Sequence, residues 1–349
     1  MPTLWGARSW RAESPRCAPD FTFSVAKETL FAVGIRATGR DNGGMTHRPV
    51  LTRTREELAA ALADLKGTRA LVMTMGALHK GHLQLVKRAK ELGDHVVVTI
   101  FVNPTQFAPG EDFDAYPRTL DADMAALESV GADLVWAPSP EDAYPEPVDL
   151  SIDPGRIAHV LEGTTRPTHF AGVALVCTKV MGLVRPDVAL FGEKDAQQLA
   201  VLRHVFSQLD VPVRVEGVPI VRDTDGVALS SRNRYLLEDE RVRARSLSKG
   251  LEAGRDAAAN GASAEQAVTA VLQVLEATGG IEVDYVALVD EGTFDILAGT
   301  PGVALVTEKD ARPATMVEGG RACRILLAAK VGTTRLIDNL PVILEVERG

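Results

Sequence analysis

The chain has 349 residues, enough for two domains, and its composition of 46% hydrophobic and 24% charged residues is typical of a folded protein. A net charge of −9 argues against a large nucleic-acid-binding surface, which would need clustered Lys and Arg. No apolar run reaches the roughly 20 residues that a membrane helix needs. Cys17, Cys177 and Cys323 form neither a disulfide framework nor a zinc pattern, so we expect two core thiols, one thiol in a tail, and a reducing cytoplasm.

The first 44 residues lack the regular pattern of the rest of the chain. They contain several Arg and Ser, as a transit peptide would, but Glu13, Asp20 and Glu28 weaken that interpretation. We favour Met45 as the natural start. Residues 1–44 are therefore predicted to be a disordered or non-native extension.

Regular elements begin after Met45. Thr54 and Glu57 have the spacing of a capping box and predict a helix that ends near Leu65. The next elements are a buried strand over 70–73, a helix over 79–92 and a β-branched strand over 95–102. A strand, helix and strand within about 30 residues form a βαβ unit, which implies a parallel sheet.

The alternation of helices and strands continues to about residue 222. After a loop over 103–118, we expect helices over 120–130, 172–183 and 196–209, and strands over 133–136, 188–191 and 213–221. Residues 238–278 have helical spacing, and strands are expected over 283–289 and 325–331. The predicted fold is α/β: a Rossmann-like doubly wound parallel sheet over 45–221 and a smaller α+β C-terminal domain over 222–349, which closes over the site.

A pair of histidines follows the first strand of the βαβ unit. In the run from Met75 to His82, Gly76 permits a tight turn, and Gly81 permits close approach of a ligand to the backbone. His79 and His82 share one face of the first helical turn, where free N–H groups and the helix dipole favour an anion. Alternatively, the two histidines could form a surface pair or a metal site. The pattern resembles the HIGH motif of the nucleotidylyl transferase superfamily, which includes class I aminoacyl-tRNA synthetases.

Two later segments could complete a phosphate site, and a third could contact a second substrate. Lys194 follows a predicted strand, and the Ser230–Arg232 segment offers two hydroxyls and a guanidinium. Gln106 ends another strand and could bind a small substrate. Taken alone, the lysine segment could be an exposed helix start, and the serine–arginine segment a polar helix cap at a domain boundary.

Together these stretches resemble the pantothenate synthetase (pantoate–β-alanine ligase) family from about residue 50 to residue 341. The segments, in the family's order, are TMGALHKGHLQLV, IFVNPTQF, DAYPRT, RPTHFAGV, LFGEKDAQQL, LSSRNRYL and VGTTRLIDN. Two positions depart from the family pattern: Met73 stands where Pro is usual, and Ala122 replaces a carboxylate of some relatives.

The resemblance implies an ATP-dependent ligation in two steps and a homodimer. Pantoate attacks the α-phosphate of ATP to give pantoyl adenylate and pyrophosphate, and β-alanine then displaces AMP to give pantothenate. His82, His79 and Lys194 would be catalytic, with charge stabilisation as their main role. Mg²⁺ would bind the phosphates, with Asp123 as its protein contact. Gln106 and Gln198 would hold pantoate, with Gln106 also near β-alanine. The implied ATP contacts are Met75, Gly76, Ala77, Leu78, His79, Lys80, Gly81, His82, Gly192, Glu193, Lys194, Asp195, Val221, Leu229, Ser230, Ser231 and Arg232.

Three other functions remain as alternatives. An adenylyltransferase of the same superfamily would transfer AMP to a phosphate ester and need no amine. A class I tRNA synthetase is disfavoured because the chain is short, acidic and lacks an anticodon-binding module. A non-enzymatic nucleotide-binding protein would not need a lysine and a Ser-Ser-Arg segment around one phosphate chain.

Overall fold

A computed structural model of the chain describes residues 48–111, 113–306 and 310–345. All of them belong to one compact unit, residues 45–349. The predictions for residues 1–44, for Met45 as the start and for Cys17 lie outside the described residues. Cys177 and Cys323 are buried free thiols, as expected for core positions. None of the described helices combines the length and apolar character needed to cross a membrane.

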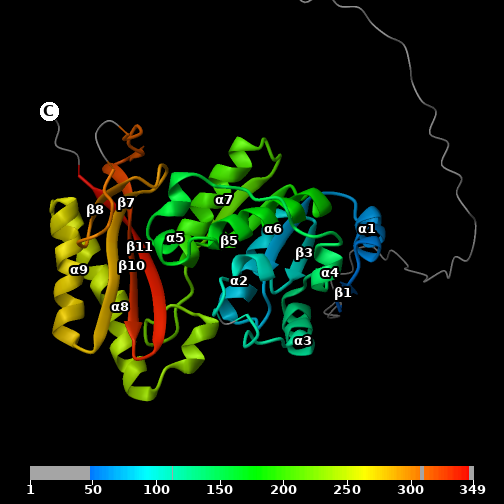
Figure 1. The fold of residues 1–349 in the computed structure, drawn as a ribbon, viewed down its shortest axis with the longest axis horizontal. Coiled ribbons are helices and arrows are strands. Elements are labelled where there is room, and N and C mark those ends of the chain that lie inside the picture. Colours follow the sequence, from blue (N-terminus) through cyan, green and yellow to red (C-terminus); the bar gives the residue numbers. More distant parts are fainter. Residues whose placement is uncertain (1–47, 112, 307–309, 346–349) are drawn as a thin grey trace, which may run out of the picture. The chain divides into compact units, whose positions relative to one another are not determined.

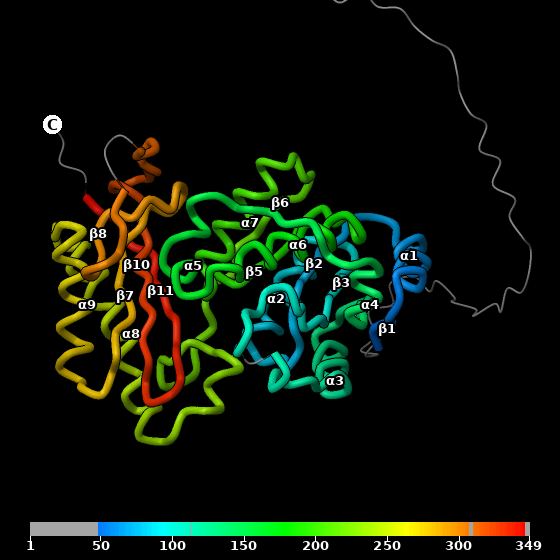
Figure 2. Tube along the Cα trace, in the orientation of Figure 1, coloured from blue at the N-terminus to red at the C-terminus, as the bar shows by residue number. Residues whose placement is uncertain are grey.

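Six parallel strands form the first sheet, in the order β1-β4-β3-β2-β5-β6. Figure 1 labels β1, β3 and β5 of this sheet. Apart from β1, which adds to one edge beside β4, the strands start with β2 in the middle and run outward in both directions, which is the doubly wound arrangement. The βαβ unit of β2, α2 and β3 can be followed in Figure 2. The strands are β1 (Val50–Thr52), β2 (Arg69–Thr74), β3 (His95–Ile100), β4 (Leu134–Trp136), β5 (Val188–Gly192) and β6 (Arg214–Val218).

Helices cover both faces of this sheet. Alternate residues of a strand point to opposite faces, so Leu71 packs in a core with α6 and α7, whereas Val72 packs in a core with α2 and α3. Burial on both faces explains why β2 and β3 are continuously apolar. The helices are α1 (Arg55–Asp64), α2 (Lys80–Leu92), α3 (Leu120–Val130), α4 (Pro140–Ala143), α5 (Glu162–Thr165), α6 (His169–Val184) and α7 (Ala196–Gln208). Short 3₁₀ turns are η1 (Pro104–Gln106), η2 (Arg156–His159), η3 (Glu193–Asp195) and η4 (Ser231–Tyr235).

A second, antiparallel sheet follows, with its main strands in the order β11-β10-β7-β8 (Figure 1). One face packs against α8 (Glu238–Ala259) and α9 (Ala264–Thr278). Residues of the other face, such as Tyr285 and Leu326, join the core that contains α6 and α7. The strands are β7 (Ile281–Asp290), β8 (Ile296–Gly299), β9 (Met316–Val317), β10 (Gly320–Val331) and β11 (Thr334–Leu344).

The predicted fold class is confirmed, with a few differences in the elements. The capping box of Thr54 and Glu57 is present. The strand expected over 213–221 stops at Val218, and the helix expected from residue 172 already begins at His169. Strands β1, β8, β9 and β11 were not among the predicted elements. Because the second sheet shares a core with α6 and α7, the domain boundary between residues 221 and 222 stays a prediction.

Candidate active site

The turn between β2 and α2 has a left-handed backbone that a carboxylate holds in place. Gly76 has φ 83° and Ala77 φ 50°, a region that glycine adopts readily and alanine only at a cost. Asp123 from α3 accepts hydrogen bonds from the N–H groups of Ala77 (3.1 Å) and Leu78 (2.8 Å). Two charge-assisted bonds thus offset the cost of this turn. They fix where α2 begins and where its first side chains point.

His79 and His82 lie at the start of α2 with their rings in contact and tilted by 32°. Their ring centroids are 4.0 Å apart. Nδ1 of His79 accepts the N–H of Gly81, and Nδ1 of His82 accepts the N–H of His79. A backbone N–H can only donate, so each neutral ring carries its proton on Nε2. A Cβ on Gly81 would lie 2.9 Å from Cε1 of His79, which explains the glycine. Both rings therefore present an Nε2–H donor.

Both imidazoles are biased toward the neutral form. Burial lowers the pKa of His82 to about 3, and the neighbouring His79 adds to this effect. Burial, followed by the positive charge of Lys194, also lowers the pKa of His79. A neutral imidazole with a low pKa is a poor proton donor in full transfer but a good hydrogen-bond donor. The pair is suited to stabilise negative charge that develops on an oxygen atom.

The lysine and the Ser-Ser-Arg segment approach from two different elements. Lys194 lies in η3, directly after β5, at the carboxyl edge where doubly wound sheets bind ligands. Ser230 caps η4, and its hydroxyl accepts the N–H of Arg232. The segment follows a hairpin closed by a hydrogen bond from Leu229 N to Val221 O (3.0 Å). Two elements distant in sequence thus bring a cation and hydroxyls to one site.

Gln106 has its amide oriented by a chain of hydrogen bonds. Oδ1 of Asn103 accepts from the N–H of Thr105 and from the hydroxyl of Tyr144 (2.9 Å). Nδ2 of Asn103 is therefore the donor, and it donates to Oε1 of Gln106 (3.2 Å). Nε2 of Gln106 then faces Met75, 3.0 Å from its sulfur. One N–H of Gln106 remains for a ligand, which suits an oxygen acceptor such as a carboxylate.

One cavity of about 260 Å³ collects most of the predicted residues. Gly76, Ala77, Leu78 and Glu193 of the predicted ATP set are not in its lining, and Lys80 is exposed on α2. The predicted residues that line the cavity are Met75, His79, Gly81, His82, Gln106, Gly192, Lys194, Asp195, Gln198, Val221, Leu229, Ser230, Ser231 and Arg232.

The carboxylate of Asp123, which was predicted as a metal contact, accepts hydrogen bonds from other residues of the chain. It is 2% exposed, and besides the two backbone N–H groups it accepts the hydroxyl of Thr119 (3.1 Å). The described residues contain no group of three or more His, Cys, Asp or Glu side chains that could hold a metal ion. These hydrogen bonds connect Asp123 to the turn, and its role as a metal contact stays a prediction.

Several lining residues were missed in the sequence. Asn103 lies in a segment quoted for the resemblance but was read as part of a loop, because only the fold reveals its bond to Gln106. His169 donates from Nδ1 to the carbonyl of Gln106 (3.0 Å), and burial followed by the charge of Arg166 lowers its pKa to about 4. Arg166 forms two bonds of 2.7 Å with Glu111. A lone histidine or ion pair carries no local signal in sequence.

A second cavity of about 250 Å³ adjoins the first. Lys194, Asp195, Gln198 and Arg232 line both. Its outer wall comes from the antiparallel sheet, including Arg335 of β11, which forms ion pairs with Glu162 of α5. The residues shared by the two cavities therefore lie between the two sheets.

A doubly wound sheet with two histidines, a lysine and an arginine around one cavity defines a Rossmann-like enzyme suited to a phosphate-bearing substrate. Comparison with known proteins narrows this class. The family model described as pantoate-beta-alanine ligase matches residues 50–341. The chain belongs to this family of ligases, which form pantothenate from pantoate and β-alanine.

Curated relatives and solved structures agree with that assignment. Pantothenate synthetase of Acidothermus cellulolyticus is 46% identical over 86% of this chain and 94% of its own, and that of Corynebacterium jeikeium is 50% identical over 82% and 86%. Among structures, pantothenate synthetase from Thermus thermophilus gives a TM-score of 0.73 at 41% identity, over 83% of this chain and 98% of its own. The Francisella tularensis ligase complexed with beta-gamma ATP and beta-alanine gives 0.65 at 28% identity, over 84% and 97%.

Proposed function

We propose that the cavity at the start of α2 performs the ligase reaction in two steps through pantoyl adenylate. In the first step a carboxylate oxygen of pantoate forms a bond to the α-phosphorus of ATP, and pyrophosphate leaves with the electrons of the broken P–O bond. In the second step the amine of β-alanine bonds to the activated carbonyl carbon, AMP leaves, and the amine loses a proton. The observation that carries the proposal is the convergence of the two Nε2–H donors, Lys194 and Arg232 on one cavity.

The phosphate chain is the natural partner of these donors. His79 and His82 offer neutral N–H groups beside the positive end of the α2 dipole. Lys194 of η3 and Arg232 of η4 supply positive charge to the same cavity. Negative charge moves onto the pyrophosphate oxygens as the P–O bond breaks, so fixed donors there stabilise the transition state more than the bound ATP.

Pantoate would lie against Gln106 and Gln198. The remaining N–H of Gln106 suits a carboxylate or hydroxyl oxygen, and both glutamines border the same cavity as the histidines. Met73 and Phe101 add apolar surface to the lining, which fits a small branched hydroxy acid. Holding the carboxylate beside the α-phosphorus lowers the entropy cost of the first step.

Mg²⁺ is proposed to accompany ATP, neutralising phosphate charge. This ion keeps most of its waters and needs only one or two protein carboxylates beside the phosphates, so a preformed protein cage is not required. Asp195 is a better-placed carboxylate than Asp123, because it borders both cavities. A homodimer and a cytoplasmic location stay predictions from the family and from the cysteine pattern.

Isotope exchange tests the two-step route. With ATP, Mg²⁺ and pantoate alone, the enzyme is expected to exchange labelled pyrophosphate into ATP, because activation of the carboxylate precedes the amine. After complete turnover, ¹⁸O from the pantoate carboxylate should be found in AMP. Exchange that required β-alanine would contradict the adenylate. Exchange supported by a phosphate ester instead of pantoate would point to an adenylyltransferase.

A further inference from the structure

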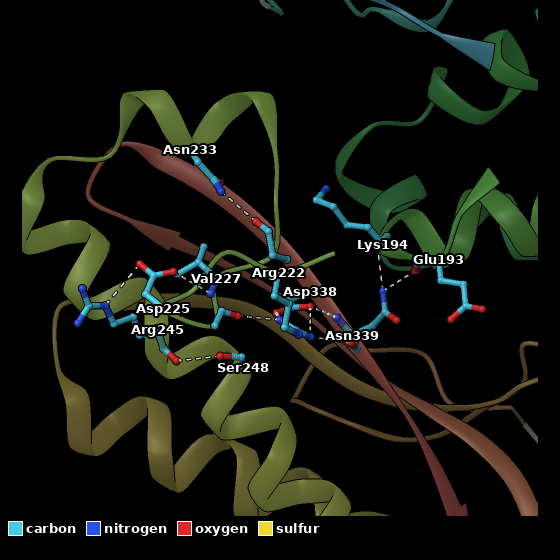
Figure 3. A network of polar contacts seen from close by, with 12 residues as sticks. Glu193, Lys194, Arg222, Asp225, Val227, Asn233, Arg245, Ser248, Asp338 and Asn339 are labelled. Carbon is cyan, nitrogen blue, oxygen red and sulfur yellow. Dashed lines mark hydrogen bonds and ion pairs between the residues drawn. The ribbon is translucent and has the colours of Figure 1, made fainter. Parts of the chain in front are cut away.

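Two adjacent polar residues of β11 are buried without being part of the predicted site. Asp338 is 4% exposed and Asn339 is 1% exposed. Successive side chains of a strand point to opposite faces, so the two reach different partners. Figure 3 shows Asn339 next to Glu193 and Lys194, and Asp338 next to Arg222. One dipeptide thus contacts two segments of the candidate active site.

Asn339 holds the backbone of the turn that carries the lysine. Its Nδ2 donates to the carbonyls of Glu193 (2.9 Å) and Lys194 (3.0 Å). Its Oδ1 accepts from the guanidinium of Arg324 (2.6 Å), which can only donate. Arg324 also pairs with Glu193 and, through two further bonds, with Glu291. The orientation of the Asn339 amide is therefore fully determined, and both of its N–H groups are used on η3.

Asp338 holds the hairpin that leads into the serine–arginine segment. Its two oxygens accept from Arg222 at 2.6 and 2.9 Å, a bidentate pair. Arg222 lies within the 221–229 hairpin and also donates to the carbonyl of Gly226 (3.1 Å). The hairpin closes at Leu229, immediately before Ser230. Fixing Arg222 therefore fixes the start of the segment that ends at Arg232.

We propose that Asp338 and Asn339 are positioning residues for adenylation, which together set the separation between Lys194 and the Ser230–Arg232 segment. The inference rests on the proposed function, because it assumes that both segments bind the same phosphate chain. Neither residue lines the cavity that contains the two histidines, although both line the adjoining one. Each acts through a bond to the backbone or side chain of a neighbouring element, and a shift of about 1 Å in a catalytic group can lower a rate on the order of 100-fold.

The sharpest variant is Asn339→Asp, which keeps the shape of the side chain. It replaces two donors by a carboxylate oxygen that faces two carbonyl oxygens, so η3 must move. We expect the pyrophosphate-exchange kcat to fall by roughly 10- to 100-fold. The control is Val271→Ala, a truncation in α9 at a fully buried core position away from both cavities. It lowers the melting temperature without displacing η3, and its kcat should stay within about twofold of the wild-type value.

A double-mutant cycle separates positioning from general stability. In a Lys194→Ala background, Asn339→Asp should cost less than about twofold in kcat, because the group that it positions is already absent. Likewise, the loss of exchange kcat caused by Asp338→Asn should disappear in an Arg232→Ala background. Full additivity in both cycles, or a kcat of Asn339→Asp equal to that of Val271→Ala, would overturn the proposal. Absence of exchange in the wild-type protein would instead overturn the proposed function, so the two failures are distinguishable.

Discussion

The two histidines of α2 combine a fixed tautomer with a lowered pKa. Because Nδ1 of each ring accepts a backbone N–H, the donor Nε2–H is available without a net positive charge. Protonated rings would repel Lys194, which already contributes to the lowered pKa of both. The site thus places its positive charge on the lysine and arginine and keeps the histidines as neutral donors.

Replacing His82 by alanine should lower the adenylation rate far more than the stability. Losing one good donor to developing charge costs on the order of 10²–10³ in rate. The ring of His82 lines the cavity, so little core packing is lost with it. The measurement is pyrophosphate exchange together with the melting temperature. Lys87→Ala, an exposed position on the same helix, is the control. Wild-type turnover in His82→Ala would remove the residue from the site.

The turn between β2 and α2 depends on a residue of another helix. Asp123 lies in α3 and bonds to the N–H groups of a backbone that includes the left-handed Ala77. Asp123 therefore connects two segments of the chain, since it lies 46 residues from Ala77 in the sequence.

Asp123→Asn should therefore weaken ATP binding. The amide presents an N–H group to at least one backbone N–H, so a charge-assisted bond is lost and the turn relaxes, at a cost of about 1.5–3 kcal/mol. We expect the KM for ATP to rise roughly tenfold or more. Asp121→Asn, exposed on the same helix, is the matched control. If excess Mg²⁺ restored the wild-type KM in Asp123→Asn, the residue would be a metal contact after all.

The elements that the sequence predicted well are those with local signals. The β2–α2–β3 unit was found because its two apolar runs and the helical spacing between them lie within one stretch of chain. The clustering of Lys194 and Ser230 was predicted only through the family resemblance. Asn339 could not be found, since its partners lie 145 and 146 residues away and a single Asn in a strand has no pattern of its own. Because β11 was not predicted, the contact of Asn339 with η3 was not predicted either.

The two sheets share an apolar core and polar contacts. Tyr285 and Leu326 of the antiparallel sheet join the core of α6 and α7. The hydroxyl of Tyr285 donates to Glu162 (2.9 Å), and Arg335 pairs with the same carboxylate. Apolar packing and ion pairs thus cross from one sheet to the other. A change in the ionisation of groups near this junction should affect the stability of the whole unit.

Stability should fall as the pH drops below about 6.5. His82 and His169 have lowered pKa values, about 3 and about 4, because burial disfavours the charged ring. In the unfolded chain both titrate near 6.5, so between that value and pH 4 the unfolded state binds more protons, and unfolding becomes more favourable. Urea titrations at pH 7.5, 6.5 and 5.5 measure the effect.

His169→Asn provides the comparison for this pH dependence. An asparagine can still donate to the carbonyl of Gln106, but it does not titrate. The variant should lose less unfolding free energy than the wild-type protein between pH 7.5 and 5.5. Equal slopes in the two proteins would show that His169 does not take part in the effect.

The dependence of Lys194 on Asn339 also affects when the site can form during translation. A ribosome completes the six strands of the parallel sheet by Val218 and the 221–229 hairpin soon after, long before it reaches β11. N-terminal parts of a chain begin to fold while synthesis continues. A nascent chain can thus contain a folded parallel sheet while η3 and the hairpin still lack their anchors. The order of the elements delays activation of the carboxylate by ATP until the antiparallel sheet has been made.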